Sequence, residues 1–294
     1  MIASAPISRT RSVLLWLLAL ALMASAVVYQ RRTGPTHPLQ GKVAVGTKTV
    51  AYKLIRSEET LRDARVALPD PGVAGTLVWR RFPTTEAWTR QAMVMETVKG
   101  QTELAGYLPR QAAAGKVEYR VELAAPAGLV TIPAKEHIVL RYKGHVPLTL
   151  LISHISMMFI SVLLGLRVGL GTVLGPLTPR KHLWVALGCM TLGGLVLGPF
   201  VQKYAFGHFW TGFPWGFDLT DNKTLIMWLA WAFACGVAGF KVSTRELLVR
   251  ITVLAATVAM IVVYLIPHSM RGSQLDYSKL QAGADAKAAV GTGR

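Results

Sequence analysis

Four runs of mostly apolar residues in the second half of the chain contain no Asp, Glu, Lys or Arg. At about 1.5 Å per residue, helices of this length approach the ~30 Å thickness of the hydrocarbon layer of a bilayer. About 18 uncharged, apolar residues are the usual threshold for a transmembrane helix. The sequence therefore predicts four membrane spans, at Leu148–Leu166, Leu183–Gln202, Thr224–Phe240 and Ile251–Ile266.

A fifth apolar run, Val13–Tyr29, follows Arg9 and Arg11 near the N-terminus. This order is typical of a signal peptide or a signal anchor, and Ala24–Ala26 has the small-x-small form that signal peptidase reads. The run is longer than most cleaved hydrophobic regions. We therefore expect residues 1–30 to be retained as an anchor, although the cleavage motif leaves removal open.

The middle of the chain, residues 31–147, has a different pattern. It carries 18 Lys and Arg against 10 Asp and Glu, and short segments in it alternate between polar and apolar residues. About seven such segments, bounded by turn residues in about 100 residues, favour an antiparallel β-sandwich. The predicted strands are Thr49–Arg56, Ala64–Leu68, Gly75–Phe82, Trp88–Val98, Thr102–Tyr107, Lys116–Leu123 and His137–Tyr142.

One stretch of this region, Tyr107–Val121, has a recognisable form. A strand ends in Leu108-Pro109, a loop of small residues follows, and a strand containing Tyr119 returns. The pattern resembles the late strands of immunoglobulin-like and fibronectin type III-like domains, over residues 44–143. The Cys–Trp–Cys pattern of antibody domains is missing. The resemblance implies a sandwich, and such domains usually bind or brace other proteins.

Basic residues beside the predicted spans indicate an orientation. With the N-terminus inside, the inner segments carry eight Lys and Arg, whereas the outer loop carries only Lys203 and Lys223 at its ends. Loops rich in Lys and Arg stay on the cytoplasmic side, so residues 31–147 are expected outside. The C-terminal tail would also lie outside, despite its own basic residues.

Together these patterns predict an α+β membrane protein of the bacterial inner membrane. The predicted parts are an N-terminal anchor (1–30), an all-β, immunoglobulin-like periplasmic ectodomain (31–147), a four-helix transmembrane bundle (148–267) and a disordered tail (268–294). No flexible linker separates the ectodomain from the first span of the bundle, so we expect the two to be rigidly joined.

Composition and motifs argue against several functions. The formal charge is +17, but the basic residues are scattered and form no nucleic-acid motif, so we expect lipid contacts and no nucleic acid. Both cysteines, Cys189 and Cys235, fall in spans, which leaves the ectodomain without a disulfide framework. No catalytic fingerprint is present, and the spans lack the charged residues and repeated halves of transporters.

The outer loop, Tyr204–Lys223, is dense in Phe, Trp and Tyr and is interrupted by glycines and a proline. One interpretation is a belt of rings at the headgroup level, with Asp221 or Thr220 capping the next helix. The other is a binding pocket beneath the sandwich. No metal site is predicted, because the acidic pattern is too short and generic. The candidate pocket residues are His208, Trp210, Trp215, Asp218, Asp221 and Asn222.

His154 is the one side chain within the predicted bundle spans that titrates near neutral pH. Three interpretations stay open. It packs between helices, bonded to a serine or a backbone carbonyl. It binds a b-type haem or a quinone, with His208 as the second partner. Or it joins Met157 and Met158, one helical turn away, in a copper site.

The leading functional prediction is non-catalytic, with no cofactor, metal or catalytic residue. The chain would be an accessory or assembly subunit that docks another membrane or periplasmic protein at the outer face, through its sandwich and aromatic outer loop. The alternative is an electron-transfer subunit that binds haem b or a quinone at His154 and His208.

Overall fold

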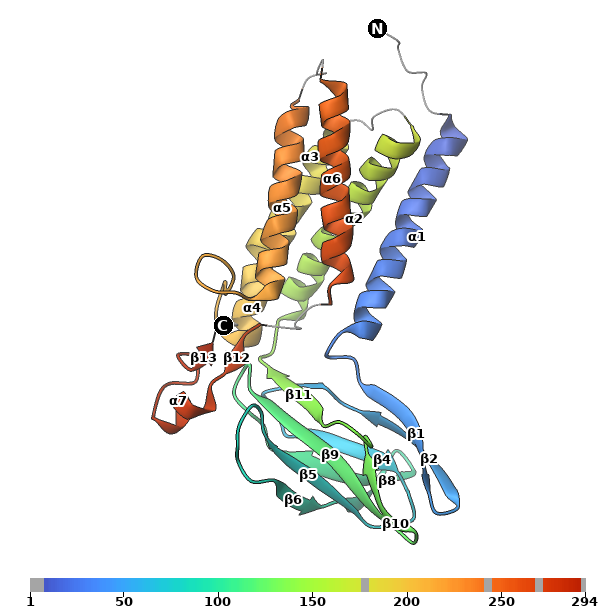
Figure 1. Ribbon diagram of the computed structural model, residues 1–294, viewed down its shortest axis with the longest axis vertical. Coiled ribbons are helices and arrows are strands. Elements are labelled where there is room, and N and C mark those ends of the chain that lie inside the picture. The colour runs from blue at the N-terminus through green and yellow to red at the C-terminus, as the bar shows by residue number, and fades with distance from the viewer. Residues whose placement is uncertain (1–7, 176–179, 241–244, 268–271, 292–294) are drawn as a thin grey trace.

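The computed structural model describes residues 8–175, 180–240, 245–267 and 272–291. Apolar helices form one end of the molecule and β-sheets the other (Figure 1). The fold is therefore mixed α+β, with the sheets in the middle of the sequence. The helices are α1 (Arg9–Thr33), α2 (Leu148–Leu174), α3 (Arg180–Met190), the π-helix η1 (Thr191–Leu197), α4 (Gly198–Phe206), α5 (Leu219–Ala238), α6 (Glu246–Leu265) and the short α7 (Tyr277–Gln281).

Four helical segments among the described residues are long and apolar enough to cross a membrane: α1, α2, the continuous run α3–η1–α4, and α6. The predicted span Thr224–Phe240 is not among them. Its helix, α5, begins at Leu219 and includes Asp221 and Lys223 in its first turns, which lowers its mean hydropathy. Helix α5 nevertheless packs against α6 and α3, because its apolar remainder faces them.

Helix α2 continues to Leu174, well beyond the predicted end of its span at Leu166. Arg167 therefore lies inside the helix and is buried, with 4% of its surface exposed. Its guanidinium donates to the Ser12 hydroxyl at 3.4 Å and lies 5.5 Å from the ring centre of Trp16. Helix α1 thus covers a charged group that would otherwise interrupt the apolar surface of α2.

The strands form three sheets in the middle of the chain. The largest has the order β3-β11-β9-β5-β6 with β10 beside β9, the second is β4-β8-β7, and β1 and β2 form a hairpin. All pairs are antiparallel except β11 with β3, so the prediction of a purely antiparallel arrangement fails at that edge. The strands are β1 (Leu39–Val45), β2 (Lys48–Leu54), β3 (Ser57–Glu59), β4 (Ala64–Pro69), β5 (Gly75–Arg81), β6 (Thr89–Ala92), β7 (Val94–Val98), β8 (Gln101–Leu108), β9 (Lys116–Ala125), β10 (Gly128–Ile132) and β11 (Ile138–Lys143).

One hydrophobic core lies between these sheets, an arrangement compatible with a sandwich. Val117, Tyr119 and Val121 alternate along β9 and are fully buried, as their spacing of two residues predicts. The sheets approach closely at Gly75 of β5, where a Cβ atom would lie 2.6 Å from Leu104 of β8. Burial of this alternating apolar set holds the sheets together.

The predicted segment Trp88–Val98 becomes two strands, because the chain changes sheets at Met93. The Met93 amide donates to the Gly75 carbonyl at 2.9 Å while its side chain enters the core. Strands β1, β3 and β10 were not predicted. Residues Ser57–Glu59 of β3 carry no apolar alternation, so only pairing with β11 defines that strand.

The prediction of a disordered tail is wrong for the described residues 272–291. They form β12 (Gln274–Leu275), α7 and β13 (Val290–Gly291), beside the sheet-side end of α4 (Figure 1). Leu275, Tyr277 and Val290 are buried together with Ala114, which lies just before β9. The small-residue composition suggested disorder, but a few well-spaced apolar side chains dock this segment. We refer to residues 272–291 as the tail.

The packing of α1 yields a prediction about processing. Leu15 and Ala19 are buried, and the Gln30 side chain donates to the Tyr264 carbonyl at 3.2 Å. Removing α1 would uncover Arg167, and a guanidinium on an apolar helical face is costly. We expect the purified chain to retain α1, which intact-mass spectrometry can check. A mass that begins after Ala26 would contradict this expectation.

Candidate docking site at the junction of the sheets and the helices

Four residues, Gly144–Pro147, connect β11 directly to α2. The Gly144 amide donates to the carbonyl of Ala205 in α4 at 2.8 Å. A Cβ atom at Gly144 would lie 2.2 Å from the Tyr204 carbonyl oxygen, so only glycine allows this approach. The connection therefore holds the sheets against the end of α4.

Arg141 of β11 is the central charged group of this junction. It is 8% exposed, and its Nη2 donates to the Ser273 carbonyl of the tail at 2.7 Å. The guanidinium also lies 4.9 Å from the ring centre of Phe206 in α4. Burial lowers the pKa of Arg141, and the nearby Asp218 carboxylate opposes that shift. One side chain thus joins a strand, a helix and the tail.

Asp218 caps the N-terminus of α5. One of its oxygens accepts from the Thr220 amide at 2.8 Å, and the other accepts from the Ser273 amide at 3.1 Å. The interfacial-belt interpretation of the sequence places the cap at Asp221 or Thr220 instead. The helix begins earlier than the apolar run indicates, so the cap moves to Asp218.

Asp221 and Asn222 hold the aromatic loop, Gly207–Phe217, which joins α4 to α5. Asp221 accepts from the Thr211 amide at 2.6 Å, and the Asn222 side-chain oxygen accepts from the Phe213 amide, also at 2.6 Å. Gly212 permits this closeness, since a Cβ there would lie 2.6 Å from that of Asp221. These candidate pocket residues therefore use their oxygen atoms to satisfy loop backbone donors that no regular helix or strand would satisfy.

Most rings of the loop are exposed. Phe209, Phe213, Trp215 and Phe217 are 44%, 64%, 72% and 66% exposed. Trp210 is less exposed and donates from its indole nitrogen to the Phe213 carbonyl at 3.1 Å. The loop is thus a braced backbone that presents large apolar side chains on its surface.

His154 and His208 have separate partners. His154 donates from Nδ1 to the Gly193 carbonyl of η1 at 2.9 Å, and the Nε2 of His208 donates to the Lys287 carbonyl of the tail at 3.1 Å. A backbone carbonyl can only accept, which fixes the proton on each of these nitrogens. No contact within the described part of the chain joins the two histidines.

The methionines near His154 fill space against the π-helix. A Cβ atom at Gly193 would lie 2.9 Å from Met157 and 3.0 Å from the sulfur of Met158, so both side chains lie close to η1. In the ranges that the structure describes, no group of three His, Cys, Asp or Glu side chains could hold a metal ion.

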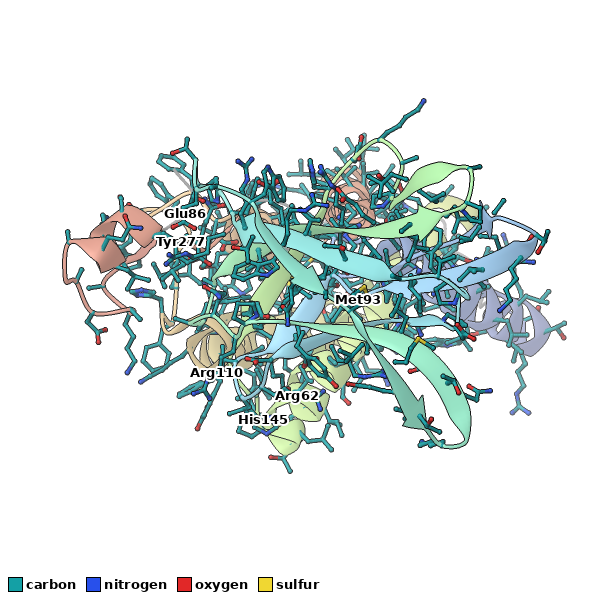
Figure 2. All side chains as sticks on the ribbon, turned by 90° about the horizontal axis from the view of Figure 1, so that it is seen from below. Arg62, Glu86, Met93, Arg110, His145 and Tyr277 are labelled. Atoms are coloured by element: carbon teal, nitrogen blue, oxygen red, sulfur yellow. The ribbon has the colours of Figure 1, made fainter. Side chains whose placement is uncertain are left out.

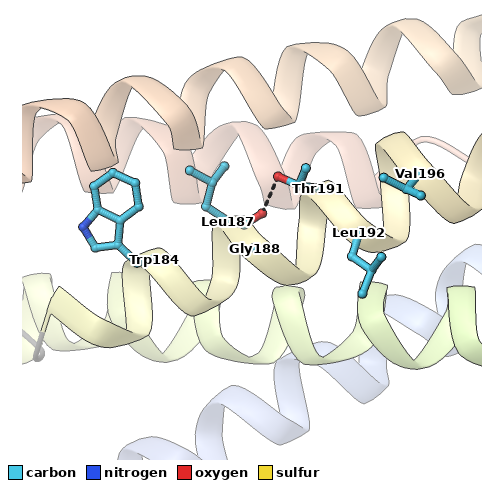
Figure 3. Close-up of a pocket in the computed structure, with 6 residues that line it drawn as sticks. All are labelled: Trp184, Leu187, Gly188, Thr191, Leu192 and Val196. Carbon is cyan, nitrogen blue, oxygen red and sulfur yellow. Dashed lines mark hydrogen bonds between the residues drawn. The ribbon is translucent and has the colours of Figure 1, made fainter.

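A shallow apolar groove of about 370 Å³ lies along α3 and η1 (Figure 3). Thr191 is one of its lining residues, and its hydroxyl accepts from the Trp228 indole at 2.8 Å and donates to the Leu187 carbonyl at 2.8 Å. Its polar atoms are therefore satisfied by the helices. The groove itself is lined by Trp184, Leu187, Gly188, Thr191, Leu192 and Val196.

Lys116 and the tail form a part of the junction that the sequence did not indicate. The Lys116 ammonium donates to the Gln274 side chain at 2.8 Å, while its backbone exchanges two hydrogen bonds with the Tyr277 hydroxyl. Figure 2 shows Tyr277 beside Glu86, at one side of the sheets. A lysine at the start of a strand normally faces water, and no sequence signal marked the tail as its cover.

Comparisons with known proteins assign no family to the chain. No protein-family model matches the chain, and no curated protein matches its sequence.

The environment of Lys116 generates a pH prediction. Burial, and then repulsion from Arg141, lower the pKa of Lys116 from 10.5 to about 8. Between these two values the unfolded chain binds more protons than the folded chain, so stability from this group rises with pH. We expect the melting temperature of the wild type to rise relative to Lys116→Met from pH ~8 to ~10. Lys135→Met, at an exposed lysine, is the matched control and should follow the wild type.

Proposed function

We propose that this chain is an accessory or assembly subunit of the bacterial inner membrane. It docks a partner protein at the outer face through its β-sandwich and aromatic loop. Its helices anchor it in the bilayer, and its sheets stand on the periplasmic side. The sheets act as an immunoglobulin-like binding or bracing domain, without catalytic chemistry of their own.

The observation that carries this proposal is that polar and aromatic side chains at the aromatic loop have different roles. Its carboxylates and amide oxygens accept hydrogen bonds from backbone groups, whereas Phe213, Trp215 and Phe217 remain exposed. A clustered apolar surface on a braced backbone is typical of protein interfaces, where aromatic anchors supply most of the binding energy. Rings at the headgroup level of a membrane would have the same exposure, so the test must separate the two roles.

The rigid junction supports the same function. Gly144 and Arg141 hold the sheets against α4, and α4 leads directly into the aromatic loop. Sheets and loop therefore present one surface whose shape is fixed before binding. A pre-organised surface loses less conformational entropy on association, which favours affinity.

The alternative, a subunit that binds a quinone or haem b, is favoured by one observation. His154 donates from Nδ1 to the Gly193 carbonyl, and ligating histidines usually use one ring nitrogen in this way while the other binds the ligand. The proposed second partner, His208, instead contacts the tail. A Soret band in the purified protein would favour haem over the docking role.

The docking role predicts that the exposed rings of the aromatic loop are needed for binding a partner and not for membrane insertion. In the triple variant Phe213→Ser, Trp215→Ser, Phe217→Ser, the amount of partner protein that co-purifies in mild detergent should fall at least about tenfold. The abundance of the variant in the membrane should stay normal. Leu61→Ser with Leu129→Ser, at exposed residues of the turn after β3 and of β10, is the control for lost surface hydrophobicity and should keep the partner.

Two results would count against docking. Unchanged co-purification at normal abundance would leave the loop as an interfacial belt. Loss of the chain from the membrane would show that the rings serve insertion. An absorption spectrum of the same samples reports on any haem.

Orientation has a separate test. In a background of Cys189→Ala and Cys235→Ala, a cysteine replacing Lys99, in the exposed β7–β8 turn, should react with a membrane-impermeant maleimide in spheroplasts. A cysteine replacing Lys181, at the start of α3, should react only after lysis. Labelling at Lys181 alone in intact spheroplasts would reverse the proposed topology.

A further inference from the structure

Two positive charges face each other across neighbouring strands beneath the tail. Lys116 of β9 and Arg141 of β11 are paired residues in the antiparallel register. Like charges directly opposite each other destabilise a sheet. Arg141 is buried and Lys116 is partly buried, so water screens their repulsion poorly.

The acceptors that the tail offers to this pair are neutral. Arg141 donates to the Ser273 carbonyl, and Lys116 donates to the Gln274 side chain. Elsewhere on the same sheet the buried acids have charged partners, as Glu118 with Arg80 and Glu122 with Arg120. Hydrogen bonds to an ionised acceptor are about twice as strong as bonds between neutral groups. Within the tail, the Lys116–Arg141 pair thus has weaker acceptors than those the sheet uses elsewhere. The nearby Asp218 carboxylate offsets part of the charge on Arg141, but its two oxygens accept from the Thr220 and Ser273 amides.

Hydrogen-bonding capacity is also left over at this point. The Nε of Arg141 and the hydroxyl of Ser273 are both buried and have no hydrogen-bond partner among the described residues. Most buried polar atoms in proteins are satisfied, and each exception needs an explanation. Here the tail covers the guanidinium without using all of its donors.

The tail nevertheless docks as a peptide would. The Leu275 amide donates to the Ala114 carbonyl at 3.1 Å, and the Tyr277 hydroxyl binds the backbone of Lys116. Leu275, Tyr277 and Val290 form a small apolar cluster with Ala114 and Phe206. Backbone bonds with side chains in a recess are the usual means by which a domain recognises an extended segment.

We propose that the tail is a displaceable cover on a peptide-docking groove, whose other occupant is an acidic segment of the partner protein. That segment carries Asp or Glu where the tail has Gln274, so that its carboxylate bridges Lys116 and Arg141. This inference rests on the proposed docking function and names the partner's chemistry. The apolar contacts and the backbone hydrogen bonds at this place already hold a peptide segment, the tail. They therefore favour a peptide over a free anion as the other occupant.

The first test strengthens the cover within the full chain in nanodiscs. Gln274→Glu should slow hydrogen exchange of the segment containing the Leu275 amide by about fivefold, because a charged acceptor replaces a neutral one. The gain should shrink in a Lys116→Gln background, where only Arg141 remains to bind the new carboxylate. Ala288→Glu adds the same charge at an exposed tail residue and should leave exchange at the wild-type rate.

The second test adds an external peptide to the wild-type full chain. Two synthetic peptides of residues 272–291 are compared, one native and one with Gln274→Glu. The acidic peptide should accelerate exchange of the resident tail at an about fivefold lower concentration than the native peptide. This arm needs no variant of the chain, so it decides the question even if Lys116→Gln does not accumulate.

Several outcomes overturn the inference. If the two peptides are equally potent, or if Gln274→Glu does not slow hydrogen exchange of the tail, the groove does not prefer an acidic segment. Exchange that depends on chain concentration would assign the groove to the tail of a second copy. Acceleration by phosphatidylglycerol vesicles, but not by the acidic peptide, would assign it to lipid phosphate.

The proposed function fails separately. If the triple aromatic variant retains its partner while the acidic peptide still displaces the tail, the proposal of an acid-binding groove is kept. The proposal that the aromatic loop docks the partner then fails. If the variant loses its partner and the two peptides are equally potent, docking through the aromatic loop is supported. The proposal that the groove binds an acidic segment is then wrong.

Discussion

The structure depends on the direct connection between β11 and α2. A flexible linker there would let the sheets move independently of the helices, but Gly144 packs against the backbone of α4 and Arg141 reaches both Phe206 and the tail. Three features of the candidate site are tied to this contact. The aromatic loop follows α4, Asp218 begins the next helix, and the tail returns to bind them both. Fixed geometry at the junction is what allows three distant segments to form one surface.

Polar groups at this junction mainly support structure. Asp218, Asp221 and Asn222 bind backbone amides, so the rings between them remain on the surface. In the proposed role these groups brace an interface without contacting the partner themselves. Lys116 and Arg141 are the exception, because the tail covers them with neutral acceptors. The two features divide the proposed recognition into an apolar part that is permanently exposed and a charged part that is covered.

The sequence predicted the helices well where apolar composition alone decides them. The uncharged runs, from Val13–Tyr29 to Ile251–Ile266, coincide with helical segments of the structure, except for the last two residues of Thr224–Phe240 and the last residue of Ile251–Ile266. It also predicted seven strand segments, because alternation marks a strand with one buried face. It missed β1, β3 and β10, and of these β3 has no such pattern and is defined only by its pairing with β11.

The sequence by itself determined that this chain has long apolar helices, a β-rich middle and a densely aromatic loop, since hydropathy and spacing are local properties. Only the tertiary structure decided where the polar atoms are used. Asp218 caps α5, the tail folds onto β9, and Lys116 lies opposite Arg141 because strands and helices far apart in sequence meet there. Hydrogen-bond partners and like-charge pairs depend on register and packing, which no single segment of sequence encodes.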